Sequence, residues 1–140
     1  MKVLTVLVPT YNVEKYLRRC LDSLLLPEVL EEIEVLVVND GSKDGSADIA
    51  RAYEKKYPQT VVFVDKENGG HGSTINVGIE KAQGTYFKVL DSDDWVNIGD
   101  FIEFVKRLKE ETADAVICDY RKEHVYNGKS EYFEYKDLED

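Results

Sequence analysis

The chain has 140 residues, and its 28 Asp and Glu against 18 Lys and Arg give a net charge of −10 at pH 7. This length is typical of one soluble domain and allows a hydrophobic core without disulfides or a structural metal. The negative charge argues against nucleic acid as the main partner, because Lys and Arg contacts to phosphate dominate that affinity, and an acidic membrane surface would also repel the chain.

Apolar runs typical of strands alternate along the chain with amphipathic stretches typical of helices. The expected strands are residues 3–8, 33–38, 61–64, 85–90 and 115–119. The expected helices are residues 13–26, 46–57 and 73–82, followed by a helix that carries Phe101, Ile102, Val105 and Leu108. Continuous apolar strands between amphipathic helices predict an α/β fold, in which a mostly parallel, Rossmann-like sheet is covered by helices on both faces.

The pattern changes after the last of these strands. Residues 122–126 and 130–135 flank Asn127-Gly128, a dipeptide that favours two-residue turns, so we expect a C-terminal β-hairpin. No internal repeat or low-complexity tract divides the sequence. Residues 1–140 are therefore expected to form a single domain.

The two cysteines, Cys20 and Cys118, are far apart in the sequence and have no Cys or His at zinc-ligand spacing nearby. The N-terminal apolar run is too short for a signal-peptide core or a membrane span. These features predict two buried, reduced thiols in a cytoplasmic protein. Contact with the cytoplasmic face of a membrane would come only through sequence outside this chain.

Ligands of open parallel sheets bind at the carboxyl ends of the strands, so the residues directly after each apolar run are the candidates for chemistry. These residues are Thr10-Tyr11-Asn12, Asn39-Asp40-Gly41-Ser42, Lys66-Glu67-Asn68-Gly69-Gly70 and Asp91-Ser92-Asp93-Asp94-Trp95. Acids, amides and glycines gather in them. Their convergence on one sheet edge is stronger evidence for a site than any one motif.

The acidic motif Asp91-Ser92-Asp93-Asp94 brings three carboxylates together after an expected strand. Carboxylates this close repel one another, and a divalent cation offsets that repulsion. Mg²⁺ and Mn²⁺ take carboxylate oxygens together with water and phosphate oxygens, so the motif predicts a site for one of them. The structural alternative is a helix N-terminus enriched in acids, where Asp interacts favourably with the helix dipole.

Two further residues at strand ends each have a binding and a structural interpretation. Asp40, before a glycine-containing turn, would accept hydrogen bonds from a nucleoside base or ribose, or would close the strand with an Asx turn. Tyr11, just beyond the first strand, would stack on a base or cover the edge of the core.

The chain resembles the N-terminal half of the family 2 glycosyltransferases, which have the GT-A fold. The motifs that carry the resemblance are Val8-Pro9-Thr10-Tyr11-Asn12, Val37 to Ser46, Glu67-Asn68-Gly69-Gly70, Asn76-Val77-Gly78 and Leu90-Asp91-Ser92-Asp93-Asp94. Each motif alone is weak, but the five occur in the family's order and spacing over roughly residues 1–120.

This resemblance implies an inverting transferase that moves a sugar from a nucleotide-diphosphate donor, usually a UDP-sugar, to an acceptor hydroxyl in polysaccharide or cell-envelope biosynthesis. The acceptor would be a glycan, a lipid-linked molecule or a protein. Asp93 and Asp94 would bind the divalent cation, Mn²⁺ or Mg²⁺, that bridges the diphosphate. The implied nucleotide-binding residues are Pro9, Thr10, Tyr11, Asp40, Asn68, Gly70, Asp91 and Asp93.

The sequence departs from the family pattern in two places. Thr74-Ile75-Asn76 stands where the family commonly has Ala-Arg-Asn, so Ile75 replaces an arginine often directed at the donor. The family's catalytic base is an Asp or Glu well beyond the acidic motif, and it is expected beyond Asp140. We therefore expect a chain that is truncated at its C-terminal end, binds the donor and has little transferase activity by itself.

Two other functions remain as alternatives. A sugar nucleotidylyltransferase would need a glycine-rich, Arg-containing phosphate loop after the first strand, and residues 9–12 contain no glycine. An acidic receiver-like signalling module needs a single phospho-acceptor Asp and a later Lys at a strand end. That alternative leaves Asn68-Gly69-Gly70 and the extra acids of the acidic motif unexplained.

Overall fold

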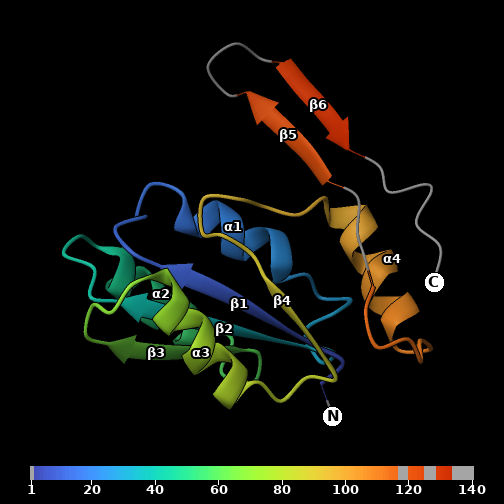
Figure 1. The fold of residues 1–140 in the computed structure, drawn as a ribbon, viewed down its shortest axis with the longest axis horizontal. Coiled ribbons are helices and arrows are strands. Elements are labelled where there is room, and N and C mark those ends of the chain that lie inside the picture. The colour runs from blue at the N-terminus through green and yellow to red at the C-terminus, as the bar shows by residue number, and fades with distance from the viewer. Residues whose placement is uncertain (1, 117–119, 125–128, 134–140) are drawn as a thin grey trace. The chain divides into compact units, whose positions relative to one another are not determined.

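The computed structural model describes residues 2–116, 120–124 and 129–133. The chain divides into a larger unit, Met1–Glu110, and a smaller one, Glu111–Asp140. In the larger unit, strands and helices alternate strictly (Figure 1). They are β1 (Leu4–Thr10), α1 (Leu17–Leu24), β2 (Ile33–Asp40), α2 (Ser46–Lys56), β3 (Val61–Lys66), α3 (His71–Lys81), β4 (Tyr86–Val89) and α4 (Ile98–Leu108).

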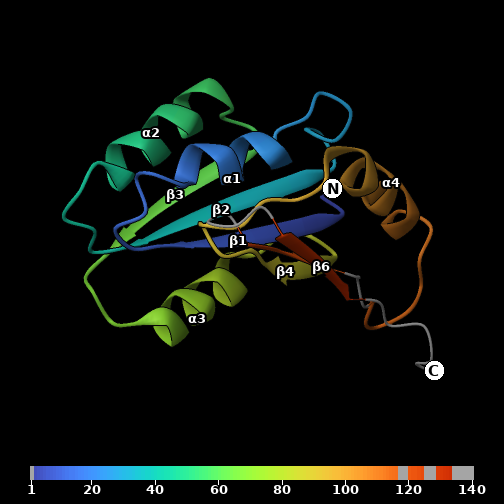
Figure 2. The ribbon, with the colours of Figure 1, turned by 90° about the horizontal axis from the view of Figure 1, so that it is seen from above.

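The four strands of the larger unit form one parallel sheet in the order β3-β2-β1-β4. Helices α1 and α2 lie over one face of the sheet and α3 lies under the other (Figure 2). The predicted α/β class, with a parallel sheet covered on both faces, is confirmed. A receiver-type sheet would place β3 beside β1, whereas here β4 lies beside β1.

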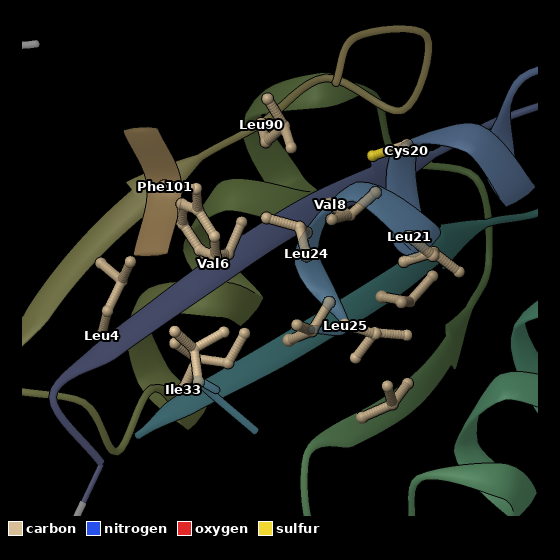
Figure 3. Packing of buried hydrophobic residues seen from close by; sticks show 14 of the residues in the cluster. Leu4, Val6, Val8, Cys20, Leu21, Leu24, Leu25, Ile33, Leu90 and Phe101 are labelled. Carbon is tan, nitrogen blue, oxygen red and sulfur yellow. The ribbon is translucent and has the colours of Figure 1, made fainter. Parts of the chain in front are cut away.

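The core is divided by the sheet into two layers. Leu4, Val6 and Val8 of β1 point toward α1, and Figure 3 shows Leu24 of α1 and Phe101 of α4 packed against this row. Leu7 of β1 points to the opposite face, where it packs with Leu36 and Val38 of β2 beneath α3. Both faces of each central strand are therefore buried, which explains why these strands read as continuous apolar runs in the sequence.

Strands β1, β2 and β3 each extend two residues beyond the C-terminal end of the predicted apolar run. β1 continues through Pro9 to Thr10, although proline lacks the N–H that a central strand needs. Its pairing with β4 ends at Leu7, so at Pro9 only the β2 side of the strand is paired among the described residues. β2 continues through Asn39 to Asp40, which pairs with Lys66 of β3. Asp40 is therefore the last residue of a buried strand and not part of a turn.

Helix α1 is shorter than the amphipathic pattern predicts. Residues Val13 to Tyr16 form a separate turn, in which the backbone N–H of Val13 donates to the Ser46 hydroxyl at 2.9 Å. The helix ends at Leu24, and Pro27 prevents it from continuing far beyond that point, because proline disfavours helical backbone at the preceding residue, Leu26. The apolar periodicity detects the buried face of this segment but not these boundaries.

A buried polar cluster joins the start of β4 to the centre of the sheet. The Thr5 hydroxyl donates to Glu34 at 2.9 Å and accepts the Gly84 N–H at 2.9 Å, while Glu34 also accepts the Gln83 N–H at 3.0 Å. A Cβ on Gly84 would lie 2.5 Å from the Thr5 nitrogen and 2.7 Å from the Leu4 carbonyl carbon. Both of these atoms belong to the backbone of a central strand, so neither can move aside.

We expect Gly84→Ala to lower the free energy of unfolding by about 2–3 kcal/mol, because the added methyl group overpacks against the sheet backbone. Urea unfolding followed by circular dichroism measures this change. Gly72→Ala is the matched control, since a Cβ at Gly72 of α3 meets no atom within 4 Å. Alanine is the better helix former, so the control should be neutral or stabilising by up to about 1 kcal/mol. Equal effects of the two substitutions would contradict this packing argument.

In the smaller unit, β5 (Tyr120–His124) pairs antiparallel with β6 (Lys129–Phe133). The expected turn Asn127-Gly128 lies outside the described residues, so the complete hairpin stays a prediction. Residues 115 and 116 of the expected preceding strand are not in a strand, and its remainder, with Cys118, also lies outside the described residues. Among the helices that the structure describes, none is long and apolar enough to cross a membrane.

Candidate functional site

The strand order creates a switch point between β1 and β4. From β1 the chain proceeds to β2 and β3 on one side, and then returns to place β4 on the other side of β1. In open parallel sheets, ligands bind in the crevice outside the carboxyl ends of the strands at such a point. The loop after β1 begins with Tyr11 and the loop after β4 carries the acidic motif, so these two loops flank the predicted binding position.

The acidic loop, residues 91–95, gathers three carboxylates. Each of Asp91, Asp93 and Asp94 offers a carboxylate oxygen, and these oxygens lie within 4.8 Å of one another. The loop turns tightly, because the Asp94 N–H donates to the Asp91 carbonyl at 2.9 Å. All three acids are exposed, while Ser92 between them is buried. The residues therefore present a set of hard oxygen donors that fits a Mg²⁺ or Mn²⁺ ion, as the sequence predicts.

The electrostatics of the acidic loop favour a bound cation. Partial burial, together with the carboxylates of Asp93 and Asp91, raises the pKa of Asp94. The Arg19 guanidinium acts in the opposite direction but does not cancel that increase. Three carboxylates without a cation therefore destabilise one another in this loop, and a divalent cation relieves that repulsion.

Helix α1 contacts the backbone at both ends of the acidic loop. Cys20 lies in the core and its thiol approaches the Asp91 carbonyl at 3.8 Å. The Ser23 hydroxyl accepts the Val96 N–H at 3.1 Å. Burial, with a contribution from the nearby acids, raises the pKa of the Cys20 thiol to about 12, so this cysteine is a neutral packing residue, buried as predicted.

The loop after β1 combines one exposed ring with an anchored backbone. The Tyr11 side chain is half exposed, at 50%, so its face is accessible to a ligand. Thr10 is buried and its hydroxyl donates to the Val8 carbonyl at 3.1 Å. Asn12 has a positive φ of 51°, and its side-chain oxygen accepts the Lys43 N–H at 2.8 Å. The loops after β1 and β2 are therefore linked directly to each other.

Asp40 is engaged within the protein. Its Oδ1 accepts from the Lys66 ammonium at 2.7 Å and from the Gly69 N–H at 2.8 Å, and its Oδ2 accepts the Gly70 N–H at 3.0 Å. Burial alone would raise the pKa of Asp40, but the hydrogen bond from Lys66 and those from the two glycine amides hold it below the ordinary value. Asp40 is therefore an ionised carboxylate that anchors the loop after β3.

The loop after β3 wraps around Asp40. The Asn68 side-chain amide donates to the Asp40 carbonyl at 3.0 Å, and the Lys66 ammonium also donates to the Ser73 hydroxyl at 2.8 Å. Gly70 has φ +94°, a conformation that L side chains rarely adopt. This geometry explains why a glycine stands at position 70, and it sets the Gly70 N–H against the carboxylate.

The structure thus brings six of the predicted site residues together in two groups. Asp40, Asn68 and Gly70 come together by bonding to one another, and Asp91, Asp93 and Asp94 converge in the acidic loop. Pro9 and Thr10 are buried at the end of β1. Only Tyr11 among the predicted nucleotide-binding residues outside the acidic loop offers a large exposed side chain.

The sequence did not predict the contacts that three further residues make in the structure. Lys66, the partner of Asp40, was recognisable as a strand-end residue, but nothing in the sequence specified its pairing. Arg19, which contacts the acidic loop, reads as an ordinary exposed helix residue. Ile75, which replaces the family's arginine, packs against the core layer beneath α3.

The chain matches known proteins over most of its length. EpsH of Bacillus subtilis (strain 168) is 41% identical over 126 residues, which are 90% of this chain and 36% of EpsH. Glycosyltransferase GlyA of Streptococcus pneumoniae serotype 4 is 38% identical over 118 residues, which are 84% of this chain and 16% of GlyA. The chain thus spans about a third of the length of EpsH and a smaller part of GlyA.

Solved structures share the fold. S. aureus TarS, whose structures include a complex with UDP-GlcNAc, superposes on 79% of this chain and 33% of its own chain with a TM-score of 0.66 and 35% identity. The mannosyltransferase PcManGT of Pyrobaculum calidifontis, solved with GDP-Man and Mn²⁺, superposes on 74% of this chain and 31% of its own with a TM-score of 0.63 and 28% identity. The expected GT-A fold is confirmed by this likeness.

The family Glycosyl transferase family 2 matches residues 5–134. The match includes the loops on both sides of the switch point, and with them the acidic loop and the residues around Asp40. It favours neither of the two alternative functions. The chain belongs to Glycosyl transferase family 2.

Proposed function

We propose that this chain is the donor-binding part of an inverting glycosyltransferase that uses a nucleotide-diphosphate sugar, with a UDP-sugar as the donor. The observation that carries the proposal is the convergence of three carboxylates within 4.8 Å at the sheet's switch point. A divalent cation between the carboxylates and the diphosphate would let an acidic protein bind an acidic ligand at such a place. TarS in complex with UDP-GlcNAc supports the choice of UDP.

We assign the cation to Asp93 and Asp94, with Mn²⁺ or Mg²⁺ as the ion and Asp91 beside the nucleotide. A bound divalent ion would supply Lewis-acid stabilisation of the charge that develops on the departing diphosphate. The protein's own contribution is to hold the two carboxylates at one position. The Mn²⁺ in the PcManGT complex supports this assignment.

The nucleoside would lie against the loops after β1, β2 and β3. Tyr11, with its exposed ring, is suited to stack on the base, while Pro9 and Thr10 form the floor of that position. A carboxylate has about four lone-pair sites, and Asp40 uses three of them within the protein. One site on Oδ2 is left for a base or ribose donor, and Asn68 and Gly70 form the adjoining wall.

The proposal concerns the donor side of the reaction. The acceptor hydroxyl would belong to a glycan, a lipid-linked molecule or a protein, and we assign the general base to none of the described residues. In the full reaction the base would remove the acceptor proton as the hydroxyl attacks the sugar from the face opposite the diphosphate. That geometry inverts the configuration at the sugar carbon.

Isothermal titration calorimetry tests the proposal. We expect UDP to bind with a Kd of about 0.1–1 mM in the presence of Mn²⁺, a weak affinity because the carboxylates and Tyr11 are exposed. Addition of EDTA should abolish the binding heat, since the diphosphate would then face three unneutralised carboxylates. Equal binding with and without EDTA, or no binding of any nucleoside diphosphate in the presence of metal, would count against the proposed function.

A further inference from the structure

We propose that Arg19 is a positioning residue that holds the acidic loop, through Trp95 and the Asp93 backbone, in the shape in which the loop binds a cation. The inference rests on the proposed function, because it gives this loop the role of a metal site. It adds a residue of helix α1 that lies 74 positions away from Asp93 in the sequence.

Arg19 contacts the acidic loop in two ways. Its guanidinium carbon lies 3.9 Å from the centre of the Trp95 ring, which is the distance of a close cation–π contact. Its Nη2 donates to the Asp93 carbonyl oxygen at 3.3 Å. A planar guanidinium can stack and donate at the same time, whereas an ammonium cannot match both geometries. One side chain therefore holds both the middle and the end of the loop.

Two other residues of α1 contact the chain at the two ends of the acidic loop. Cys20 approaches the Asp91 carbonyl and Ser23 accepts the Val96 N–H. Between Asp91 and Val96, Arg19 donates a hydrogen bond to the Asp93 carbonyl and stacks on the Trp95 ring. The hydrogen bond from Arg19 goes to the backbone of Asp93, and within the described residues Arg19 forms no ion pair with an acid of the loop. The carboxylates stay available for a cation.

The direction of the expected effect separates positioning from simple electrostatics. Arg19 carries a positive charge beside the proposed cation, so removal of the charge alone should make a divalent ion bind more tightly. Removal of a residue that orients a metal ligand has the opposite effect and commonly weakens metal affinity about 10–100-fold. A weaker affinity after loss of Arg19 can therefore not come from its charge.

The experiment compares Arg19→Met with Arg18→Met in the full chain. Arg18 is the neighbouring arginine on α1 but lines the groove between α1 and α2, so its loss changes the net charge by the same amount without touching the acidic loop. Mn²⁺ titration followed by the electron paramagnetic resonance signal of the free ion gives the Kd. We expect Arg19→Met to raise the Kd for Mn²⁺ about tenfold and Arg18→Met to change it less than twofold.

A second readout is independent of metal. Trp95 is the one tryptophan of the chain, so its fluorescence reports on the acidic loop alone. We expect acrylamide to quench Trp95 about twice as strongly in metal-free Arg19→Met as in the metal-free wild type, with unchanged circular dichroism, because the indole loses its guanidinium cover. Arg18→Met should leave the quenching unchanged.

The outcomes separate this inference from the proposed function. If the wild type binds Mn²⁺ and Arg19→Met binds it equally or more tightly, the positioning role is wrong and the proposed function stands. If the wild type binds no Mn²⁺, the proposed metal site is wrong. The role of Arg19 toward a cation is then also wrong, whatever the quenching shows. Weaker Mn²⁺ binding together with stronger quenching in Arg19→Met supports the inference.

Discussion

Replacement of Asp94 by asparagine is expected to raise the Kd for Mn²⁺ at least about a hundredfold and to abolish metal-dependent UDP binding, while the fold stays intact. Asparagine keeps the shape of the side chain but removes a charged ligand from the three that converge in the acidic loop. The pKa of Asp94 is raised by partial burial and by Asp93 and Asp91, so loss of its charge relieves repulsion in the metal-free protein. The free energy of unfolding without metal should be unchanged or slightly higher.

Calorimetry with Mn²⁺ and urea unfolding without metal measure the two halves of this prediction. Asp48→Asn is the matched control: it removes one negative charge from a side chain on α2 that is 89% exposed. The control should bind Mn²⁺ like the wild type. Unfolding of Asp94→Asn would instead favour a structural role for the acidic loop, and unchanged Mn²⁺ affinity would remove Asp94 from the metal site.

Replacement of Asp40 by asparagine is expected to lower the free energy of unfolding by about 2–3 kcal/mol, the largest stability change that we predict for a site residue. The asparagine NH₂ group would face an N–H or ammonium donor where the carboxylate now accepts from Lys66, Gly69 and Gly70. The Lys66 side chain, 19% exposed, would also lose its carboxylate partner. The loop after β3 would then no longer be anchored to β2.

Asp65→Asn on the adjacent strand β3 is the control for Asp40→Asn. Asp65 accepts from Asn39 and pairs with Arg51, but its side chain is 51% exposed, so its loss should cost less than about 1 kcal/mol. Urea unfolding at pH 7 compares the two variants. Equal losses would mean that the contacts of Asp40 contribute no more than an exposed ion pair.

The stability difference between the wild type and Asp40→Asn should depend on pH. The pKa of Asp40 is lowered in the folded protein relative to the unfolded value of about 3.9. The stabilisation from its ionised form is therefore complete above the unfolded pKa and is lost as the pH falls through the lower folded pKa. The difference in unfolding free energy between the wild type and Asp40→Asn should stay constant from pH 7 to about pH 5 and narrow below about pH 4. A difference independent of pH would contradict this account.

Much of the fold was predictable because burial determines it locally. The run at residues 33–38 is apolar without interruption, since both faces of β2 are covered, and such a run is a strong strand signal. Element ends were less predictable, because they depend on neighbours distant in sequence. Pro9 stays in β1 because β4 stops short of it, and Asp40 stays in β2 because it pairs with Lys66 of β3.

In the candidate site, too, the features set by neighbouring residues were predictable and those set by distant residues were not. The acids of the acidic loop are neighbours in the sequence, so their convergence followed from the motif itself. The state of Asp40 did not, because its partners come from Lys66 and two backbone amides of another loop. The contact between Arg19 and Trp95 joins an ordinary helix position to a loop far along the chain, and no periodicity predicts such a pair.

The sequence by itself determined the α/β class, the family resemblance and the acidic motif, because apolar runs and short-range motifs depend on neighbouring residues. Only the tertiary structure decided the sheet order β3-β2-β1-β4, and with it the switch point that sets Tyr11 and the acidic loop on either side of one position. The physical reason is that strand order depends on long-range packing. The structure also shows where part of the net charge of −10 lies, since three of the acids meet at one sheet edge. A divalent cation there would let an acidic protein bind an acidic ligand.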